Sequence, residues 1–174
     1  MAAAIAVRRA LAARSSAEIA IRWPNDLLLR DRKAAGILAE AGPWIDPPGW
    51  ALGIGVNVNQ RPEDFAPELR ESATSLSAAA GGAPIDRAAL FADLAWELEQ
   101  ALDRAASAEG REAIRAEWER HCLAIGRVLR IDLHGEIVEG TAVGLDSQGG
   151  LILRLPGGPL RTLLSGTVLK AAGE

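Results

Sequence analysis

The chain has 174 residues, and 49% of them are hydrophobic, which is enough to bury a core. The formal net charge is −4 and the pI is near 5.3, so no broad basic field is available to hold a nucleic acid backbone. A single cysteine, Cys122, excludes an intrachain disulfide and disfavours a zinc site, and no apolar run approaches the roughly 20 residues that a membrane span needs.

The chain opens with a predicted helix and a predicted strand. Residues 2–14 are rich in alanine and carry apolar side chains at helical spacing, which predicts a helix that packs on a neighbouring surface. Residues 18–23 alternate, which puts their apolar side chains on one face of a strand. Pro24 has no N–H to donate, and we expect the strand to end there.

A hairpin is predicted next. The run 27–29, a polar turn at 30–32 and the run 33–40 indicate two strands joined by a tight turn. Gly36 lies inside the second strand, where a glycine weakens the strand unless another group must approach its backbone closely.

One more strand is predicted before the helical part of the chain. A proline-rich loop at 43–49 precedes residues 50–59, which have the nearly continuous apolar character of a buried strand and contain Gly53 and Gly55. Residues 60–83 are expected to form loop and short turns.

Two helices are predicted in the middle of the chain. Asp86 is a suitable N-cap, and leucines follow at intervals of four residues from Leu90 to Leu102. We expect Gly110 to separate this helix from a second one over 111–121. The tryptophans of these helices, expected in the core, are Trp96 and Trp118.

From Gly126 onward the pattern changes to short alternating segments, which is typical of a small antiparallel barrel. The turn residues that separate the segments fall at 134–135, 146–150, 156–159 and 165–166. We therefore predict a domain boundary near residue 124, with one unit over 1–124 and a β-barrel over 125–174.

Polar groups or glycines that packing alone does not explain occur in three segments, namely 22–26, 32–36 and 53–57. Each segment has a structural alternative. The Asn25-Asp26 pair after proline favours a turn, the glycines are compatible with β-bulges, and Asn57 is compatible with a strand-end cap.

A hairpin with an adjacent strand would bring Lys33, Gly36, Gly53 and Asn57 together on one sheet. Glycines let a flat ligand lie against the backbone, an ammonium stabilises an anion, and an asparagine pairs with the edge of a base. Only two of the 19 basic residues are lysines, so Lys33 stands out as a compact ammonium retained among arginines. These residue types predict a site for a nucleotide-linked carboxylate.

Four segments, in order and spacing, resemble biotin–protein ligases. They are Trp23-Pro-Asn-Asp26, Arg32-Lys33-x-x-Gly36-Ile-Leu-x-Glu40, Gly53-Ile-Gly-Val-Asn57-Val-Asn59 and Ala73-Thr-Ser-Leu76. The terminal section resembles the SH3-like barrel of that family, so the resemblance covers nearly the whole chain. It implies an α+β fold, with a mixed β-sheet and packed helices like an incomplete class II synthetase domain, followed by a small SH3-like β-barrel.

The family joins the biotin carboxylate to AMP from ATP with Mg²⁺, and then transfers biotin to a lysine of a biotin carboxyl carrier protein. The resemblance therefore implies an ATP-dependent ligase that acts through biotinyl-5′-AMP on a carrier such as that of acetyl-CoA carboxylase. With the composition, it implies a cytoplasmic protein without nucleic acid or membrane partners and without a metal site of its own. A homodimer formed through a sheet edge is compatible with this prediction.

The resemblance also implies residue roles. Lys33 would contact the biotin carboxylate and the α-phosphoryl oxygens, where it stabilises developing charge. Gly36 and Gly53 match positions whose backbone lies beside biotin. Asp26, the second predicted catalytic residue, would orient the incoming lysine amine or interact with Mg²⁺ and phosphate. The positions that match residues near the adenylate are Arg22, Asn25, Asp26 and Asn57.

The chain departs from the family pattern at its start. The Gly/Arg-rich loop that closes over biotinyl-adenylate should precede these motifs, and it is not present, so we expect an N-terminally truncated ligase. Either the recorded start is late, or another chain completes the sheet. Missing strands would leave open edges and an apolar face. Arg22 also stands where the family has lysine, which alters phosphate geometry.

Three other hypotheses remain at this point. The chain could be a non-catalytic module that binds biotin, biotinyl-adenylate or the carrier, a lipoate-type protein ligase, or a structural α+β fragment. Lys170 is a weaker candidate for positioning ATP or the carrier. Residues expected to be structural are His121, Cys122 and His134.

Overall fold

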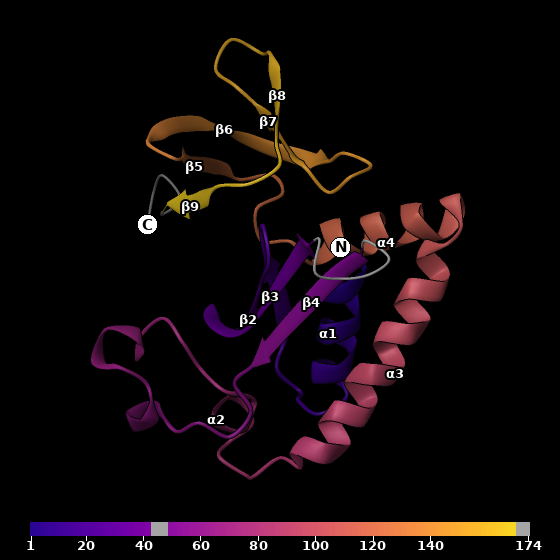
Figure 1. The fold of residues 1–174 in the computed structure, drawn as a ribbon. Helices are drawn as coiled ribbons and strands as arrows, with labels where there is room; N and C mark the ends of the chain where they lie inside the picture. Colours follow the sequence, from indigo (N-terminus) through magenta and orange to yellow (C-terminus); the bar gives the residue numbers. More distant parts are fainter. Residues whose placement is uncertain (43–48, 170–174) are drawn as a thin grey trace.

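The computed structural model describes residues 1–42 and 49–169, which form two β-sheets with helices beside and between them (Figure 1). The proline-rich loop, apart from Gly49, and Lys170 lie outside the described residues. Within those ranges no helix is both long enough and apolar enough to cross a membrane. The elements are α1 (Ala2–Ala12), β1 (Ile19–Arg22), β2 (Asp26–Leu29), β3 (Arg32–Gly42), β4 (Gly49–Val56), η1 (Pro62–Asp64), η2 (Pro67–Leu69), α2 (Leu76–Ala79), α3 (Arg87–Ala105), α4 (Ala108–His121), β5 (Val128–Leu133), β6 (Glu136–Leu145), β7 (Leu151–Arg154), β8 (Leu160–Leu163) and β9 (Thr167–Leu169).

The first sheet has four antiparallel strands in the order β1-β2-β3-β4. The predicted hairpin is confirmed as β2 and β3, and the ladder between them shifts register between Leu27 and Leu28. Helix α1 covers one face, where Val7 and Leu11 join the buried side chains of the strands in one hydrophobic cluster. Because side chains alternate across a strand, Asp26 and Gly36 belong to the other face.

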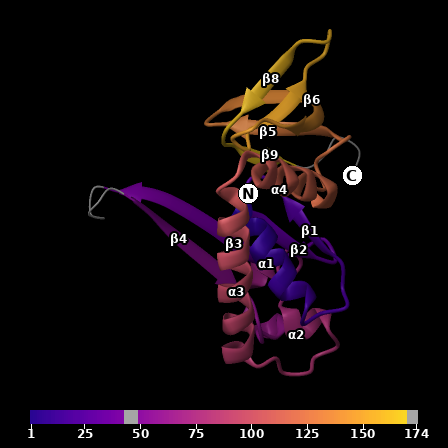
Figure 2. The same ribbon diagram turned by 90° about the vertical axis from the view of Figure 1, so that its right-hand side faces the viewer.

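The strand predicted within residues 50–59 is confirmed, but its predicted burial is wrong. Residues 49–56 form strand β4, but Trp50 is 73% exposed and Leu52 is also exposed. Among the described strands β4 pairs only with β3, and Figure 2 shows the β3–β4 hairpin extending beyond the helices that cover the rest of the sheet. Only its inner end, at Ile54 and Val56, packs partly against the core.

Helix α3 begins at the predicted cap, because the Asp86 carboxylate accepts hydrogen bonds from the backbone N–H groups of the first turn, at 2.8 and 3.1 Å. The predicted separator at Gly110 is wrong, since this residue lies inside α4. The break instead falls before Ser107, whose hydroxyl caps α4 by accepting from the Gly110 N–H at 2.9 Å. A glycine is needed at 110 because a Cβ there would lie 1.8 Å from the carbonyl oxygen of Arg104.

The leucine stripe of α3 faces the core only at its start. Leu90 is buried, whereas Leu102 is exposed. A spacing of four residues overshoots one helical turn by about 40° per step, so the stripe rotates away from the core along the helix. The expected burial of Trp118 is confirmed, but that of Trp96 is wrong, because this side chain is 61% exposed.

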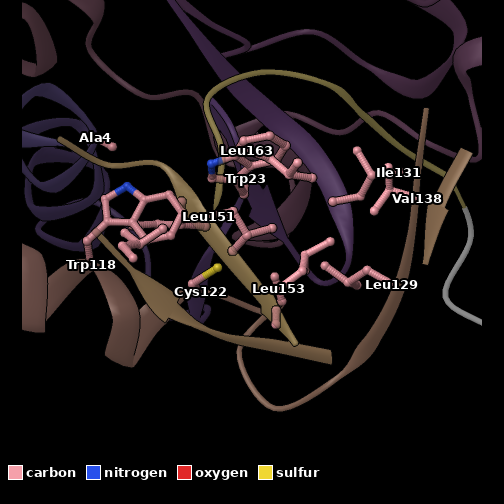
Figure 3. Packing of buried hydrophobic residues seen from close by; sticks show 14 of the residues in the cluster. Ala4, Trp23, Trp118, Cys122, Leu129, Ile131, Val138, Leu151, Leu153 and Leu163 are labelled. Atoms are coloured by element: carbon pink, nitrogen blue, oxygen red, sulfur yellow. The ribbon is translucent and has the colours of Figure 1, made fainter. Parts of the chain in front are cut away.

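The second sheet has five antiparallel strands in the order β8-β7-β6-β5-β9, and all four predicted turn segments separate its strands. The α+β fold class is thereby confirmed. The two sheets share one hydrophobic cluster, in which Trp23 and Trp118 pack with Leu151 and Leu153 (Figure 3). Burial raises the pKa of the Cys122 thiol, which belongs to the same cluster.

An ion-pair network joins three helices beneath the first sheet. Arg9 of α1 donates two hydrogen bonds to the Glu117 carboxylate of α4, at 2.9 and 2.6 Å. Arg104 of α3 lies 3.6 Å from the same carboxylate. Burial alone would raise the pKa of Glu117, but the hydrogen bonds and positive charges of these arginines hold it below the ordinary value.

We expect Glu117→Gln to lower the free energy of unfolding by about 2 kcal/mol at neutral pH, because it removes the charged acceptor of two hydrogen bonds. A carboxylate whose pKa is lowered in the folded state stabilises the fold above its unfolded pKa, near 4.3, and this stabilisation is lost as the pH falls through the folded value. Urea unfolding at pH 7 and at pH 3 checks this. The difference between wild type and variant should shrink in acid, and the exposed Glu99→Gln control should change little at either pH.

Candidate functional site

Four residues, one from each strand, form a row across the first sheet. Arg22 is paired with Asp26, Asp26 with Gly36, and Gly36 with Gly55. Directly paired residues of antiparallel strands point to the same side, so the row lies on one face. This is the face opposite to the one that packs on α1.

The row carries a charged cluster at the β1 end. Arg22 donates to Oδ2 of Asp26 at 2.7 Å, and the Lys33 ammonium lies 2.5 Å from Oδ1. The Asp26 side chain is 14% exposed, whereas those of Lys33 and Arg22 are 45% and 43% exposed. Two cations share one carboxylate, so the cluster keeps a net positive charge and has donors free to meet an anion.

The backbone of Lys33 is held from a distant segment. Its N–H donates to the Ser72 carbonyl oxygen at 2.8 Å, and its carbonyl oxygen accepts from the Thr74 N–H at 2.9 Å. The segment 72–74, which overlaps the fourth motif of the resemblance, therefore positions the lysine of the second motif. Sequence spacing gives no sign of this contact, since some 40 residues of chain separate the partners.

Asn57 braces the same segment. Its Nδ2 donates to the carbonyl oxygen of Thr74 at 3.0 Å and to that of Lys33 at 3.4 Å. Its backbone N–H donates to the carbonyl oxygen of Ala34 at 2.8 Å. The side chain follows the end of β4 and ties Lys33 to the 72–76 segment.

Three glycines make the sheet face beside the cluster flat. Gly36, Gly53 and Gly55 lie in regular ladder rather than at bulges, and none has a left-handed backbone. A Cβ at Gly53 or Gly55 would meet only ordinary contacts, at 3.7 Å or more. At Gly36 a Cβ would lie 3.3 Å from Nζ of Lys33. Neither backbone conformation nor packing within the described chain requires glycine at 53 and 55, which leaves room for a ligand as the explanation.

Gly55 was not among the predicted site residues. The alternation of a strand puts it on the same side as Gly53, and this signal was available in the sequence.

Asn25 lies apart from the cluster. Its side chain donates to the carbonyl oxygen of Ile37 at 2.8 Å, and its own carbonyl oxygen accepts from the Ile37 N–H at 3.0 Å. With Ile37 and Leu52 it lines a hollow of about 170 Å³ on the other side of the hairpin. The structure brings together Arg22, Asp26, Lys33, Gly36, Gly53 and Asn57, but not the Asn25 side chain.

Comparison with known proteins connects this geometry to one family. Residues 124–170 match the family model described as the biotin protein ligase C terminal domain. The chain is 38% identical over 152 residues to the bifunctional ligase/repressor BirA of Bacillus subtilis (strain 168), covering 87% of this chain and 46% of the relative. It is 39% identical over 143 residues to the biotin–[acetyl-CoA-carboxylase] ligase of Mycobacterium tuberculosis, covering 81% of this chain and 49% of the relative. The chain thus spans about half the length of these relatives.

Solved structures agree on the fold. The crystal structure of a biotin protein ligase from Aquifex aeolicus superimposes with a TM-score of 0.85 at 24% identity, covering 98% of this chain and 73% of that one. A complex of the Aquifex enzyme with biotin and ATP gives a TM-score of 0.82 over the same share of this chain.

We expect Asn57→Ala to lower the free energy of unfolding by about 1–2 kcal/mol, because two carbonyl oxygens lose their side-chain donor. The loss should be accompanied by faster amide hydrogen exchange at Thr74, whose N–H bonds to Lys33. Hydrogen exchange followed by NMR measures both effects. Gln60→Ala, which truncates an exposed neighbouring side chain, is the control, and equal effects of the two variants would contradict a bracing role for Asn57.

Proposed function

We propose, from the premise that this chain is homologous to biotin protein ligases along 87% of its length, that its first sheet carries the biotin-adenylating face of a biotin–[biotin carboxyl-carrier protein] ligase. The reaction would form biotinyl-5′-AMP from biotin and ATP and then pass biotin to a carrier lysine. One observation carries the proposal: glycines that neither backbone nor packing requires lie beside a cluster with a net positive charge.

The cluster suits the adenylation step. An oxygen of the biotin carboxylate would attack the α-phosphorus, and the bond to the leaving pyrophosphate would break with its electron pair. Negative charge then grows on the phosphoryl oxygens, where the half-exposed Lys33 ammonium can stabilise it. Asp26 would act mainly by holding Lys33 and Arg22 in place, because both of its oxygens are paired with them.

The remaining predicted residues take supporting roles in this proposal. The backbone of Gly36 and Gly53, together with that of Gly55, would lie against the biotin rings. Asn57 would contribute to the adenylate side through the position it gives to Lys33. Asn25 would act through the turn that it fixes against β3.

Mg²⁺ would be held chiefly by the phosphates of ATP. Among the described residues there is no group of three or more metal-ligating side chains, and Asp26 is the carboxylate at the cluster. Both oxygens of Asp26 are already paired with Lys33 and Arg22, so the phosphates and water would supply the ligands of Mg²⁺, which commonly keeps several waters when bound. Its charge would help to neutralise the polyphosphate.

We further propose a cytoplasmic enzyme whose partner is a biotin carboxyl carrier protein such as that of acetyl-CoA carboxylase. The names of the relatives support this partner. Some relatives are named repressors, but the net negative charge of this chain argues against a nucleic acid partner. Dimerisation through a sheet edge stays a proposal. The division into 1–124 and 125–174 is supported by the family match at 124–170.

A second candidate is a module that binds biotin or the carrier without adenylation. The flat glycine face would serve such binding as well as it would serve catalysis. Such a module would bind biotin and show no exchange of pyrophosphate into ATP.

Biotin-dependent ATP–pyrophosphate exchange tests the proposal. The assay uses the 174-residue chain and a polypeptide extended to the length of its relatives in the genomic frame. Lys33→Met should lower exchange at least about 100-fold, because a charge aimed at the transition state is lost. Lys33→Arg should recover little of it, since a guanidinium differs in shape. Arg70→Met, at an exposed loop arginine, serves as the matched control. Exchange that survives Lys33→Met would exclude the proposed role, and no exchange by either polypeptide would favour the binding module.

A further inference from the structure

A cleft of about 250 Å³ lies between the first and second sheets. Its first-sheet side is formed by residues of β1, β2 and the turn after β2, and its other side by the start of β5 and by β9. Its lining includes Arg22, Leu28, Asp31, Arg127, Leu129 and Leu169.

The cleft begins at the charged cluster. Arg22 lines it and also donates to Asp26, which in turn holds Lys33. Leu28, another lining residue, is the direct cross-strand partner of Lys33. A molecule whose reacting end contacts Lys33 could therefore extend past Arg22 into the cleft.

Arg127 enters the cleft from a fixed position. Its backbone N–H donates to the Ala124 carbonyl oxygen at 3.0 Å, and its carbonyl oxygen accepts from the Ala142 N–H at 2.9 Å. The second sheet is anchored on α4, where Oε1 of Glu119 accepts from the Leu145 N–H at 2.7 Å. The Arg127 side chain is exposed, and no carboxylate of the described chain lies within salt-bridge distance of it.

We infer that Arg127 and Arg22 together bind the outer phosphates of ATP and the pyrophosphate that leaves. This inference rests on the proposed function and deepens it, because it brings the second sheet into the adenylation site. Guanidinium groups bind phosphate oxygens through paired hydrogen bonds, and the apolar walls at Leu129 and Leu169 strengthen that attraction by excluding water. As the α-phosphorus–oxygen bond breaks, the added negative charge of pyrophosphate falls between the two arginines.

Asp31 opposes the anion. Asp31 lines the same cleft, is a turn residue with φ 62°, and has no salt bridge among the described residues. Removing this charge should therefore strengthen the binding of a polyphosphate.

Isothermal titration of the 174-residue chain with inorganic pyrophosphate tests the inference. Arg127→Ala should weaken binding roughly tenfold, and Arg127→Lys should restore part of it because charge returns without the paired geometry. Asp31→Asn should strengthen binding a few-fold. Arg130→Ala is the matched control, since Arg130 is an exposed arginine of the same sheet that does not line the cleft and lies near Glu139.

Thermal melts establish that each variant is folded. Equal weakening by Arg127→Ala and Arg130→Ala would overturn the inference, because it would show that pyrophosphate responds only to the overall positive charge of the surface. A wild-type chain that binds no pyrophosphate would also overturn it. Titration with biotin on the same samples separates this result from failure of the proposed function. Arg127→Ala should leave biotin affinity unchanged, whereas a chain that binds pyrophosphate but not biotin would count against the proposed function alone.

Discussion

The Asp26 carboxylate between two cations is the interaction on which the rest of the site depends. It is mostly buried, and each of its oxygens faces a different cation, Lys33 on one side and Arg22 on the other. Removing one partner from such a group leaves charge without compensation, so the three residues act as a unit. The antiparallel register makes the unit possible, because it places Asp26 directly between Arg22 and Gly36. The glycines that follow keep the face open next to the ammonium.

The surroundings of this unit divide into a rigid side and an open side. On the rigid side, the shared hydrophobic cluster fixes the second sheet against β1 and α4, so that Arg127 can face Arg22 across a cleft. On the open side, the β3–β4 hairpin extends with Trp50 and Leu52 exposed. An exposed apolar strand with an unpaired edge commonly marks a surface that another polypeptide segment covers. The flat face that includes Gly53 thus has the second sheet on one side and the unpaired edge of β4 on the other.

Local patterns predicted much of this structure, and long-range contacts account for what they did not predict. The hairpin and the turns of the second sheet follow from alternation and turn residues, which act over a few positions. The apolar composition of β4 predicted a buried strand, because composition does not tell whether a strand has a covering partner. The expectation of open edges and an apolar face came from the family resemblance instead. The position of Lys33 depends on the 72–74 segment and on the bulge in β3, where Ala34 is the extra residue of the ladder, and neither has a sequence signature here. The resemblance grouped Asn25 with the adenylate residues, but its side chain is bonded to β3 on the other side of the hairpin.

We propose that biotinyl-adenylate binds to the glycine-lined face next to the Asp26 unit. NMR of the ¹⁵N-labelled chain, titrated with a non-hydrolysable biotinyl-adenylate analogue, tests it most directly, since glycine amides report on ligands that lie against the backbone. We expect saturable shifts at Gly36, Gly53 and Gly55, together with Lys33. Shifts confined to the apolar groove between α1, α3 and β4, or no shifts at a saturating concentration, would contradict it.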